Sequence, residues 1–276
     1  MADRMRLRDR CAVITGAGNG IGAALAHRLA ERGCHLALAD IRPHDLEATR
    51  MSIRERLGDA SPPVSLHTLD VADRDSVAAL PEAVAERHSR VDLLINNAGV
   101  ALGGTFEQSS EADFDWLMEI NLLGLVRMTR AFLPLLHESD DARLVNISSL
   151  FGLIAPPGQT AYSAAKFGVR GFSNALAEEL KRSTVGVTVV HPGGIRTGIA
   201  QRARAPQGAS NAQVEREQKR FERLLRMPPA RAAEIIVDAI ERRKRRVLVG
   251  SDAKVLALVE RLMPVGYPAI VERLAR

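Results

Sequence analysis

Short apolar runs rich in β-branched residues alternate with longer stretches of helical spacing over most of the chain. The apolar runs predict strands at 11–15, 35–40, 64–70, 91–96, 143–149, 186–191 and 246–250. Helical periodicity fills the intervals, at 21–32, 44–57, 74–88, 112–136, 160–182 and 229–242. Alternation of this kind indicates a parallel sheet with right-handed crossovers and helices on both faces. We therefore expect an α/β fold with one doubly wound, seven-stranded parallel sheet.

Two segments depart from this alternation. Residues 194–227 are too long and too polar for a simple connection between a strand and a helix. Within them Asn211 is a candidate N-cap, and Val214, Phe221 and Leu225 then lie roughly on one face of a short helix. Residues 251–276 carry an apolar helical stripe close to arginines. We expect 1–250 to form one domain with 194–227 inserted in it, and 251–276 to extend that domain.

Composition excludes several other classes of protein. The 276 residues are 46% hydrophobic and 26% charged, which is typical of a globular chain. Two cysteines cannot form a disulfide framework or a four-thiolate zinc site, and the seven histidines lack metal-ligand spacing. No apolar run reaches about 18 residues, and no apolar segment of a secretory signal follows the N-terminal arginines, so we expect a cytoplasmic protein. The net charge of +5 comes without a zinc-finger or RNA-binding signature, so we expect no nucleic-acid partner.

A glycine cluster lies between the first predicted strand and the first predicted helix, in the run Thr15-Gly16-Ala17-Gly18-Asn19-Gly20-Ile21-Gly22. Glycines at such a junction allow a tight turn and let the backbone approach a pyrophosphate at the N-terminus of the helix. This placement predicts a dinucleotide site. The candidate cofactor contacts in the loop are Gly16, Gly18, Asn19, Gly20, Ile21 and Gly22.

An acidic residue, Asp40, ends the second predicted strand and is followed by Ile41 and Arg42. A carboxylate there can accept hydrogen bonds from the hydroxyls of the adenosine ribose, and it repels a 2′-phosphate. Asn19 in the glycine loop is neutral, whereas Arg42 could attract a phosphate. The pattern favours NAD over NADP, with NADP kept as the alternative.

Several further motifs occur in a fixed order along the chain. Asn96-Asn97-Ala98-Gly99 follows the fourth predicted strand, and Tyr162-Ser163-Ala164-Ala165-Lys166 opens a helix. Ser149 precedes the tyrosine by thirteen residues, and Pro192-Gly193 follows the sixth strand. Together with the spacing T-G-x-x-x-G-I-G, these motifs resemble the short-chain dehydrogenase/reductase family over about residues 11–250. Their shared order and spacing make the resemblance specific.

The resemblance implies a Rossmann fold with strand order 3-2-1-4-5-6-7, and a homodimer or homotetramer. It also implies four catalytic residues, namely Asn121, Ser149, Tyr162 and Lys166. Asp70 and Val71 resemble the pair that reaches the adenine, and residues 194–227 take the place of the family's substrate-covering lid. The remaining cofactor contacts implied by the family are Asn97, Ala98, Gly99, Tyr162, Lys166, Pro192, Gly193, Ile195 and Thr197.

The chemistry of the tyrosine and lysine can be argued from their spacing. Residues four apart lie on one face of a helix, so Lys166 is expected beside Tyr162. A neighbouring cation favours phenolate, so we expect the pKa of Tyr162 to be depressed from its usual value near ~10. Tyr162 then acts as general base in alcohol oxidation and as general acid in carbonyl reduction. Ser149 donates to the substrate oxygen, and Ser148, on the opposite face of a strand, cannot.

The sequence thus predicts an NAD(H)-dependent enzyme that interconverts a secondary alcohol and a ketone or aldehyde, with a lipophilic substrate bound under the lid. Its expected substrate contacts are Leu102, Ser149, Leu150, Phe151, Tyr162, Gly193, Phe221 and Leu225. Three alternatives stay open: an NADP-dependent reductase of the 3-oxoacyl type, a dinucleotide-sensing scaffold without catalysis, and membrane association through residues 252–276. No G-x-S-x-G elbow is present, which disfavours an α/β-hydrolase.

Overall fold

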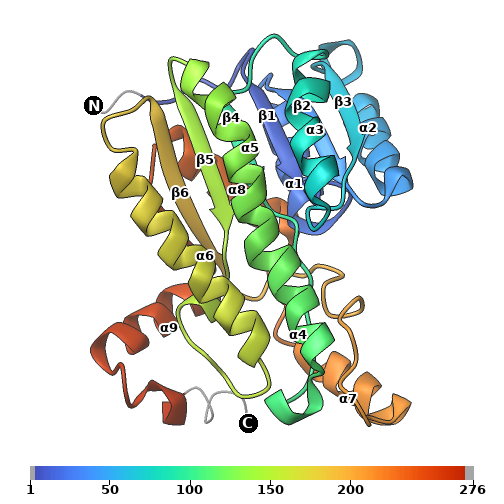
Figure 1. Ribbon diagram of the computed structural model, residues 1–276, viewed down its shortest axis with the longest axis vertical. Coiled ribbons are helices and arrows are strands. Elements are labelled where there is room, and N and C mark those ends of the chain that lie inside the picture. The colour runs from blue at the N-terminus through green and yellow to red at the C-terminus, as the bar shows by residue number, and fades with distance from the viewer. Residues whose placement is uncertain (1–3, 271–276) are drawn as a thin grey trace.

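Seven parallel strands form the central sheet in the order β3-β2-β1-β4-β5-β6-β7, which confirms the predicted topology (Figure 1). The computed structural model describes residues 4–270. The central strand β1 pairs with β2 on one side and with β4 on the other, so that Ala12 lies opposite both Leu36 and Leu93. In chain order the strands are Cys11–Thr15, His35–Asp40, Val64–Thr68, Leu93–Asn96, Ala142–Ile147, Val185–Pro192 and Arg246–Val249.

Helices cover both faces of this sheet, and each face has its own apolar core. Helices α1 (Gly20–Ala30), α2 (Pro43–Leu57) and α8 (Pro229–Glu241) pack on one face, around side chains such as Ile14 and Leu36. Helices α3 (Arg74–Ala85), α5 (Leu125–Glu138) and α6 (Thr160–Glu179) cover the other, around Val13 and Phe132. Because side chains alternate along a strand, successive residues of β1 enter opposite cores. A strand that is buried on both faces therefore has apolar residues at consecutive positions.

The largest difference from the predicted elements lies at 112–136, which is not one helix. Helix α4 (Glu111–Met118) runs into a π-helical turn at Glu119–Gly124, and α5 begins at Leu125. A π-turn pairs residue i with i+5, so the backbone widens locally, and such turns often occur at functional sites. Apolar spacing alone does not reveal this insertion.

Several predicted boundaries are also shifted. Strands β3 and β5 end at Thr68 and Ile147, so Asp70 and Ser149 lie in the loops that follow, and β4 begins only at Leu93. Helix α7 (Asn211–Glu222) is capped by Ser210, and the predicted cap at Asn211 is wrong. The Ser210 hydroxyl accepts from the Gln213 amide, and the Gln213 side chain accepts from the Ser210 amide, which together make a capping box.

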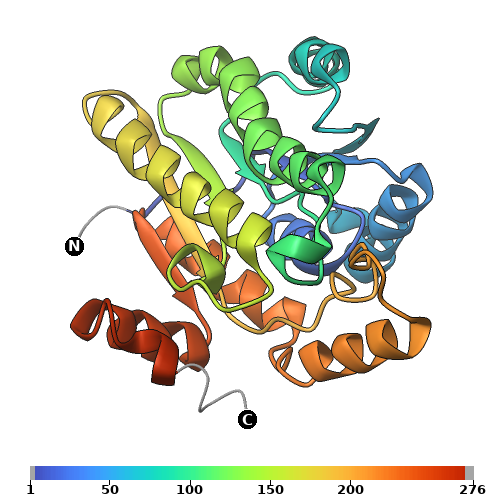
Figure 2. The ribbon, with the colours of Figure 1, turned by 60° about the horizontal axis from the view of Figure 1, so that its bottom comes forward.

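The inserted segment and the C-terminal extension both lie beyond the carboxyl ends of the strands. Helices α7 and α9 (Ser251–Leu262) lie at this end of the molecule, which is turned forward in Figure 2. In α9 the small residues Ala253 and Ala257 are buried, while Val255, Leu258 and Leu262 are exposed. No helix formed by residues 4–270 is long and apolar enough to cross a membrane. Residues 271–276 of the predicted extension lie outside the described residues.

Candidate active site

A cavity of about 1110 Å³ opens at the carboxyl edge of the sheet, where the strand order reverses between β1 and β4. Ligands of doubly wound sheets bind at such a switch point. The predicted residues that line this cavity are Gly16, Asn19, Gly20, Ile21, Asp40, Ile41, Arg42, Asp70, Val71, Asn97, Ala98, Gly99, Ser149, Leu150, Phe151, Tyr162, Lys166, Pro192, Gly193, Ile195, Thr197, Phe221 and Leu225. Four others, Gly18, Gly22, Asn121 and Leu102, do not line it. The structure thus brings most of the predicted site together.

The glycine loop is shaped by close backbone contacts. A Cβ on Gly22 would lie 2.1 Å from the carbonyl oxygen of Gly16, and a Cβ on Gly16 would lie 2.9 Å from the Cα of Ala98. Gly16 and Gly20 also have positive φ angles of 65° and 56°, which disfavour any residue with a side chain. Gly22 and Gly18 therefore shape the loop from beneath rather than line the cavity.

The side chain of Asn19 occupies the N-cap position of α1 without capping the helix. The first amide groups of α1 therefore lack a side-chain acceptor from this residue. Unpaired N–H groups and the positive end of the helix dipole favour an anion at that point. The local geometry fits a phosphate group there.

Asp40 is a buried carboxylate that lines the cavity beside the glycine loop. Its Oδ2 accepts from the Gly18 amide at 3.0 Å, and its Oδ1 accepts from the Arg42 amide at 3.1 Å. A carboxylate has about four acceptor positions, so these two bonds fix its orientation and leave capacity for hydroxyl donors. Arg42 itself pairs with Asp45, at 2.5 Å between Nε and Oδ2.

The loop after β4 is joined to the glycine loop by hydrogen bonds. Thr15 Oγ1 accepts from the amides of Asn97 and Ala98, and Asn97 Nδ2 donates to the carbonyls of Thr15 and Gly16. Asp70 accepts from the amide of Ala72 and so stabilises its own turn. The contacts of Thr15 and Asn97 thus hold two loops of the cavity together, and Asp70 fixes the turn of a third.

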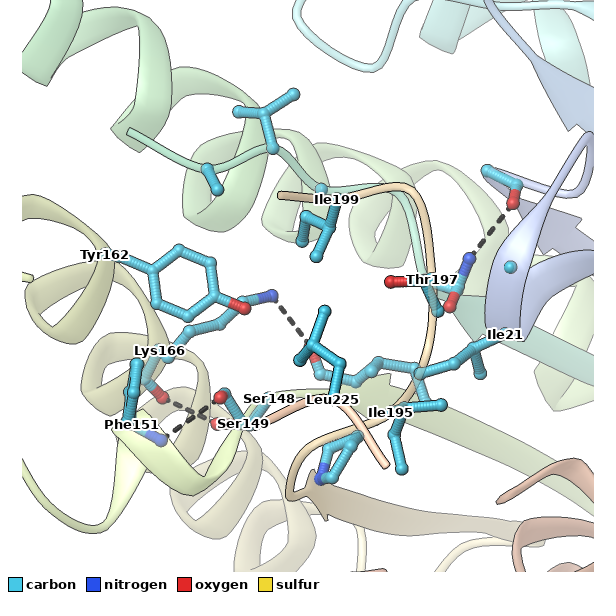
Figure 3. A pocket seen from close by; sticks show the side chains of 18 of the residues that line it. Ile21, Ser148, Ser149, Phe151, Tyr162, Lys166, Ile195, Thr197, Ile199 and Leu225 are labelled. Carbon is cyan, nitrogen blue, oxygen red and sulfur yellow. Dashed lines mark hydrogen bonds between the residues drawn. The ribbon is translucent and has the colours of Figure 1, made fainter. Parts of the chain in front are cut away.

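Ser149, Tyr162 and Lys166 converge at the other end of the cavity (Figure 3). Lys166 Nζ donates to the Ile147 carbonyl at 3.0 Å and lies 5.7 Å from the centre of the Tyr162 ring. Ser149 Oγ accepts from the Phe151 amide, while Ser148 Oγ donates to the Lys166 carbonyl. Ser148 also lines the cavity, but its hydroxyl proton is donated to the helix, whereas the hydroxyl proton of Ser149 is not used in this way. Among residues 4–270 the Ile147 carbonyl is the one hydrogen-bond acceptor of Lys166, so two of its three N–H donors remain for other groups.

The charge states at this end are set mainly by burial. Burial raises the pKa of Tyr162, and the nearby Ser149 hydroxyl opposes that effect. Burial also lowers the pKa of the Lys166 ammonium to about 8. The expected depression of the Tyr162 pKa is therefore wrong for the protein by itself, because desolvation of the buried phenolate is the largest effect on that pKa.

Asn121 lies in the π-helical turn and does not line the cavity. Its side chain forms hydrogen bonds with the backbone of the loop after β4. Its Nδ2 donates to the Val100 carbonyl at 2.9 Å and its Oδ1 accepts from the Val100 amide at 2.8 Å. A Cβ on Gly99 would lie 3.2 Å from this Oδ1 and 3.6 Å from Lys166 Nζ. The side chain of Asn121 therefore positions the loop after β4 next to the lysine.

Two further residues support the backbone of the site, although no signal in the sequence assigns them this role. His191 is fully buried, and its Nδ1 lies 2.9 Å from the Ser149 carbonyl, which requires a proton on that nitrogen. Burial lowers the pKa of His191 to about 4, so it is neutral at neutral pH and supports the Ser149 backbone. Asp252, in the first turn of α9, accepts from the Gly194 amide at 2.7 Å.

Apolar side chains form the wall around the tyrosine. The Phe151 ring packs edge-on against Tyr162, with 6.1 Å between ring centres. Leu150 and Leu225 are buried nearby. Trp116, Ile154, Ile199 and Leu256 also line the cavity and were not predicted from the sequence. This end of the cavity fits a lipophilic ligand.

Taken together, the sheet topology, the glycine loop and the serine–tyrosine–lysine group define a class of protein, the oxidoreductases that use a nicotinamide dinucleotide. The sequence profile of the short chain dehydrogenases matches residues 10–208. The chain belongs to this family.

Individual relatives agree with this assignment. A Mycobacterium tuberculosis protein that carries an oxidoreductase name, SadH, is 42% identical over 265 residues, which cover 95% of this chain and 94% of that protein. A 3-oxoacyl-[acyl-carrier-protein] reductase, FabG of Thermotoga maritima, is 32% identical over 72% of this chain and 79% of its own length. The crystal structure of a short chain dehydrogenase/reductase from Burkholderia phymatum in complex with NAD superimposes with a TM-score of 0.86 and 28% identity, covering 94% of this chain and 95% of that one.

Proposed function

We propose that the protein is an NAD(H)-dependent oxidoreductase that interconverts a secondary alcohol and a ketone or aldehyde of a lipophilic molecule. The observation that carries this proposal is the convergence of Ser149, Tyr162 and Lys166 on an apolar cavity that also contains the glycine loop. The nicotinamide, when bound, donates or accepts the hydride. The protein supplies orientation and the proton.

The side chains have distinct parts in this reaction. The Tyr162 hydroxyl donates its proton to the substrate oxygen during reduction and takes it back during oxidation. Ser149 donates a hydrogen bond to the same oxygen and stabilises its developing charge. Lys166 is fixed by the Ile147 carbonyl near the tyrosine and favours its anionic form when protonated.

The raised pKa of Tyr162 affects which direction of the reaction is faster at a given pH. Because burial raises the pKa of Tyr162, the protonated form prevails at neutral pH. Reduction uses this form, whereas oxidation uses the deprotonated one. We infer that carbonyl reduction is favoured near neutral pH and that alcohol oxidation becomes faster as the pH rises.

The proposal is tested with a panel of secondary alcohols with NAD and NADP, and of the matching ketones with NADH and NADPH, followed at the absorbance of the reduced nicotinamide. Turnover of at least one apolar pair supports it. Tight binding of dinucleotide without turnover of any pair would instead favour the dinucleotide-sensing scaffold.

Cofactor preference is expected to depend on the charge of Asp40. We predict that Asp40→Asn lowers the ratio of kcat/KM for NAD to kcat/KM for NADP by about tenfold, because the variant loses the repulsion of a 2′-phosphate. Steady-state kinetics with both cofactors measures this ratio. Asp59→Asn, an exposed site outside the cavity, should leave it unchanged. An unchanged ratio in Asp40→Asn would remove Asp40 from the specificity argument.

A second candidate function is an NADP-dependent reductase of the 3-oxoacyl type. It is favoured by Arg42, which lines the cavity beside Asp40, and by the similarity to the Thermotoga reductase. The buried Asp40 carboxylate opposes it, since a 2′-phosphate would share the site with that charge. The comparison of NAD with NADP, and of NADH with NADPH, in the panel of substrates decides between the two candidate functions.

We further propose that residues 194–227 form a lid whose helix α7 contributes to the substrate wall. Phe221 and Leu225 line the cavity from this segment. Phe221→Ala is expected to raise KM for bulky apolar ketones about five- to tenfold and to leave KM for small ones nearly unchanged, because it removes part of an apolar contact area. The comparison uses a homologous series of ketones. Phe106→Ala, on an exposed ring outside the cavity, is the control. Equal effects on small and bulky ketones would contradict the lid.

A further inference from the structure

Residues 198–206, which we call the strap, cross from the glycine loop to the loop after β4. At one end Arg202 Nη2 donates to Asn19 Oδ1 at 2.6 Å. At the other end the Arg204 amide donates to the Ala101 carbonyl, and the Arg204 carbonyl accepts from the Gly103 amide. The strap thus joins two loops that border the cavity.

Arg204 fixes the far end of the strap through its side chain as well. Its guanidinium lies over the ring of Trp116, 3.6 Å from the ring centre, and its Nη1 donates to Asp113 at 2.7 Å. A stacked cation with a carboxylate partner is a stable arrangement for arginine. Arg204 therefore has a complete set of partners within the protein.

Arg202 differs from Arg204 in this respect. Among residues 4–270 it forms no salt bridge, and its hydrogen bond goes to a neutral amide oxygen. It lines the cavity, where burial and, to a smaller degree, the charge of Arg42 lower its pKa, while the nearby carboxylates of Asp45 and Asp40 oppose that effect without forming a salt bridge with it. A partly buried guanidinium with a neutral partner is able to bind an anion without first breaking an ion pair.

The position of Arg202 indicates which anion this residue binds. Its partner Asn19 is the N-cap residue of α1 and does not cap that helix. The strap also touches this loop through its neighbour Thr197, because a Cβ on Gly20 would lie 3.1 Å from Thr197 Cγ2. The diphosphate of a dinucleotide binds at this point of a doubly wound sheet, over the glycine loop and the helix N-terminus.

We propose that Arg202 is a cofactor-binding residue that binds the diphosphate of the dinucleotide and so couples cofactor binding to closure of the strap. This inference rests on the proposed function. Because Ile199 of the strap and the preceding Thr197 both line the cavity, the bound diphosphate also holds this part of the cavity wall. Coupling of this kind is reciprocal, so cofactor and substrate each strengthen the binding of the other.

The chain contains a single tryptophan, Trp116, which lines the cavity and allows the test. Energy transfer from Trp116 to NADH gives the dissociation constant of NADH, and displacement of NADH gives those of ADP-ribose and adenosine. We expect Arg202→Gln to weaken NADH and ADP-ribose by about tenfold each, because a charge-assisted hydrogen bond is lost, and to leave adenosine, which has no phosphate, unchanged. Arg223→Gln, which removes the same charge from an exposed position of the inserted segment, should change none of them.

The controls keep the outcomes distinct. Unchanged adenosine binding shows that Arg202→Gln is folded, and Arg202→Lys should fall between the wild type and the glutamine variant, since lysine retains the charge without the planar fork. Equal NADH affinity in wild type and Arg202→Gln would overturn the inference. So would weakening confined to NADPH, which would assign Arg202 to a 2′-phosphate. Absence of NADH binding in the wild type would instead overturn the proposed function itself.

Discussion

Replacement of Tyr162 by phenylalanine is expected to lower kcat for ketone reduction by about 10²–10⁴-fold, the usual contribution of a general acid. The phenyl ring retains the packing against Phe151, so the variant should stay folded. The dissociation constant of NADH should change little, because the phenolic oxygen alone is removed. Stopped-flow absorbance of NADH and Trp116 fluorescence measure the two quantities.

The chain offers a matched control for this variant. Tyr267 is the other of its two tyrosines, and its hydroxyl accepts from the Ala155 amide outside the catalytic group. Tyr267→Phe removes the same atom and should retain turnover close to that of the wild type. Turnover of Tyr162→Phe within a few-fold of the wild type would contradict the role of Tyr162 as proton donor.

The second large effect is expected from Gly22→Ala. The added methyl would lie 2.1 Å from the Gly16 carbonyl, which is backbone and cannot rotate away. Forced contacts of this kind cost about 1–3 kcal/mol of folding free energy, and the glycine loop has to shift to relieve them. We expect a lower Tm and NADH affinity weakened by at least about tenfold, measured by thermal unfolding and by Trp116 fluorescence.

Gly171→Ala adds the same methyl group, but it is expected to have the opposite effect on stability. Gly171 lies in α6, and a Cβ there meets no atom within 4 Å. Alanine is favoured over glycine inside a helix by about 0.5–1 kcal/mol, so this variant should be slightly more stable and bind NADH normally. If both variants behaved alike, the close packing of the glycine loop would not determine cofactor binding.

The sequence predicted those features that depend on short-range pattern. The parallel sheet and the two helical layers follow from alternation of apolar strands and helices, and the glycine loop is a local motif. Tyr162 and Lys166 share a helix face because they are four residues apart. Each of these predictions needed only neighbours along the chain.

The features that were missed depend on contacts between distant segments. The π-helical turn that holds Asn121 against Val100 widens a helix whose apolar spacing appears continuous. Arg202 binds Asn19, and Arg204 stacks on Trp116. Each partner lies almost 90 or more positions earlier in the chain, so no local sequence pattern identifies these contacts. The pKa of Tyr162 depends on how completely several elements bury it, and spacing to one lysine could not give its direction.

The most direct measurement of the central claim follows the hydride itself. The ketone that the panel shows to be reduced fastest is incubated with NADH deuterated at either face of nicotinamide C4, and the alcohol is analysed by mass spectrometry and NMR. We predict deuterium on the carbinol carbon with one of the two labelled cofactors, and loss of this transfer in Tyr162→Phe. Alcohol without deuterium from either cofactor, or undiminished transfer in Tyr162→Phe, would contradict hydride transfer at the Ser149–Tyr162–Lys166 site.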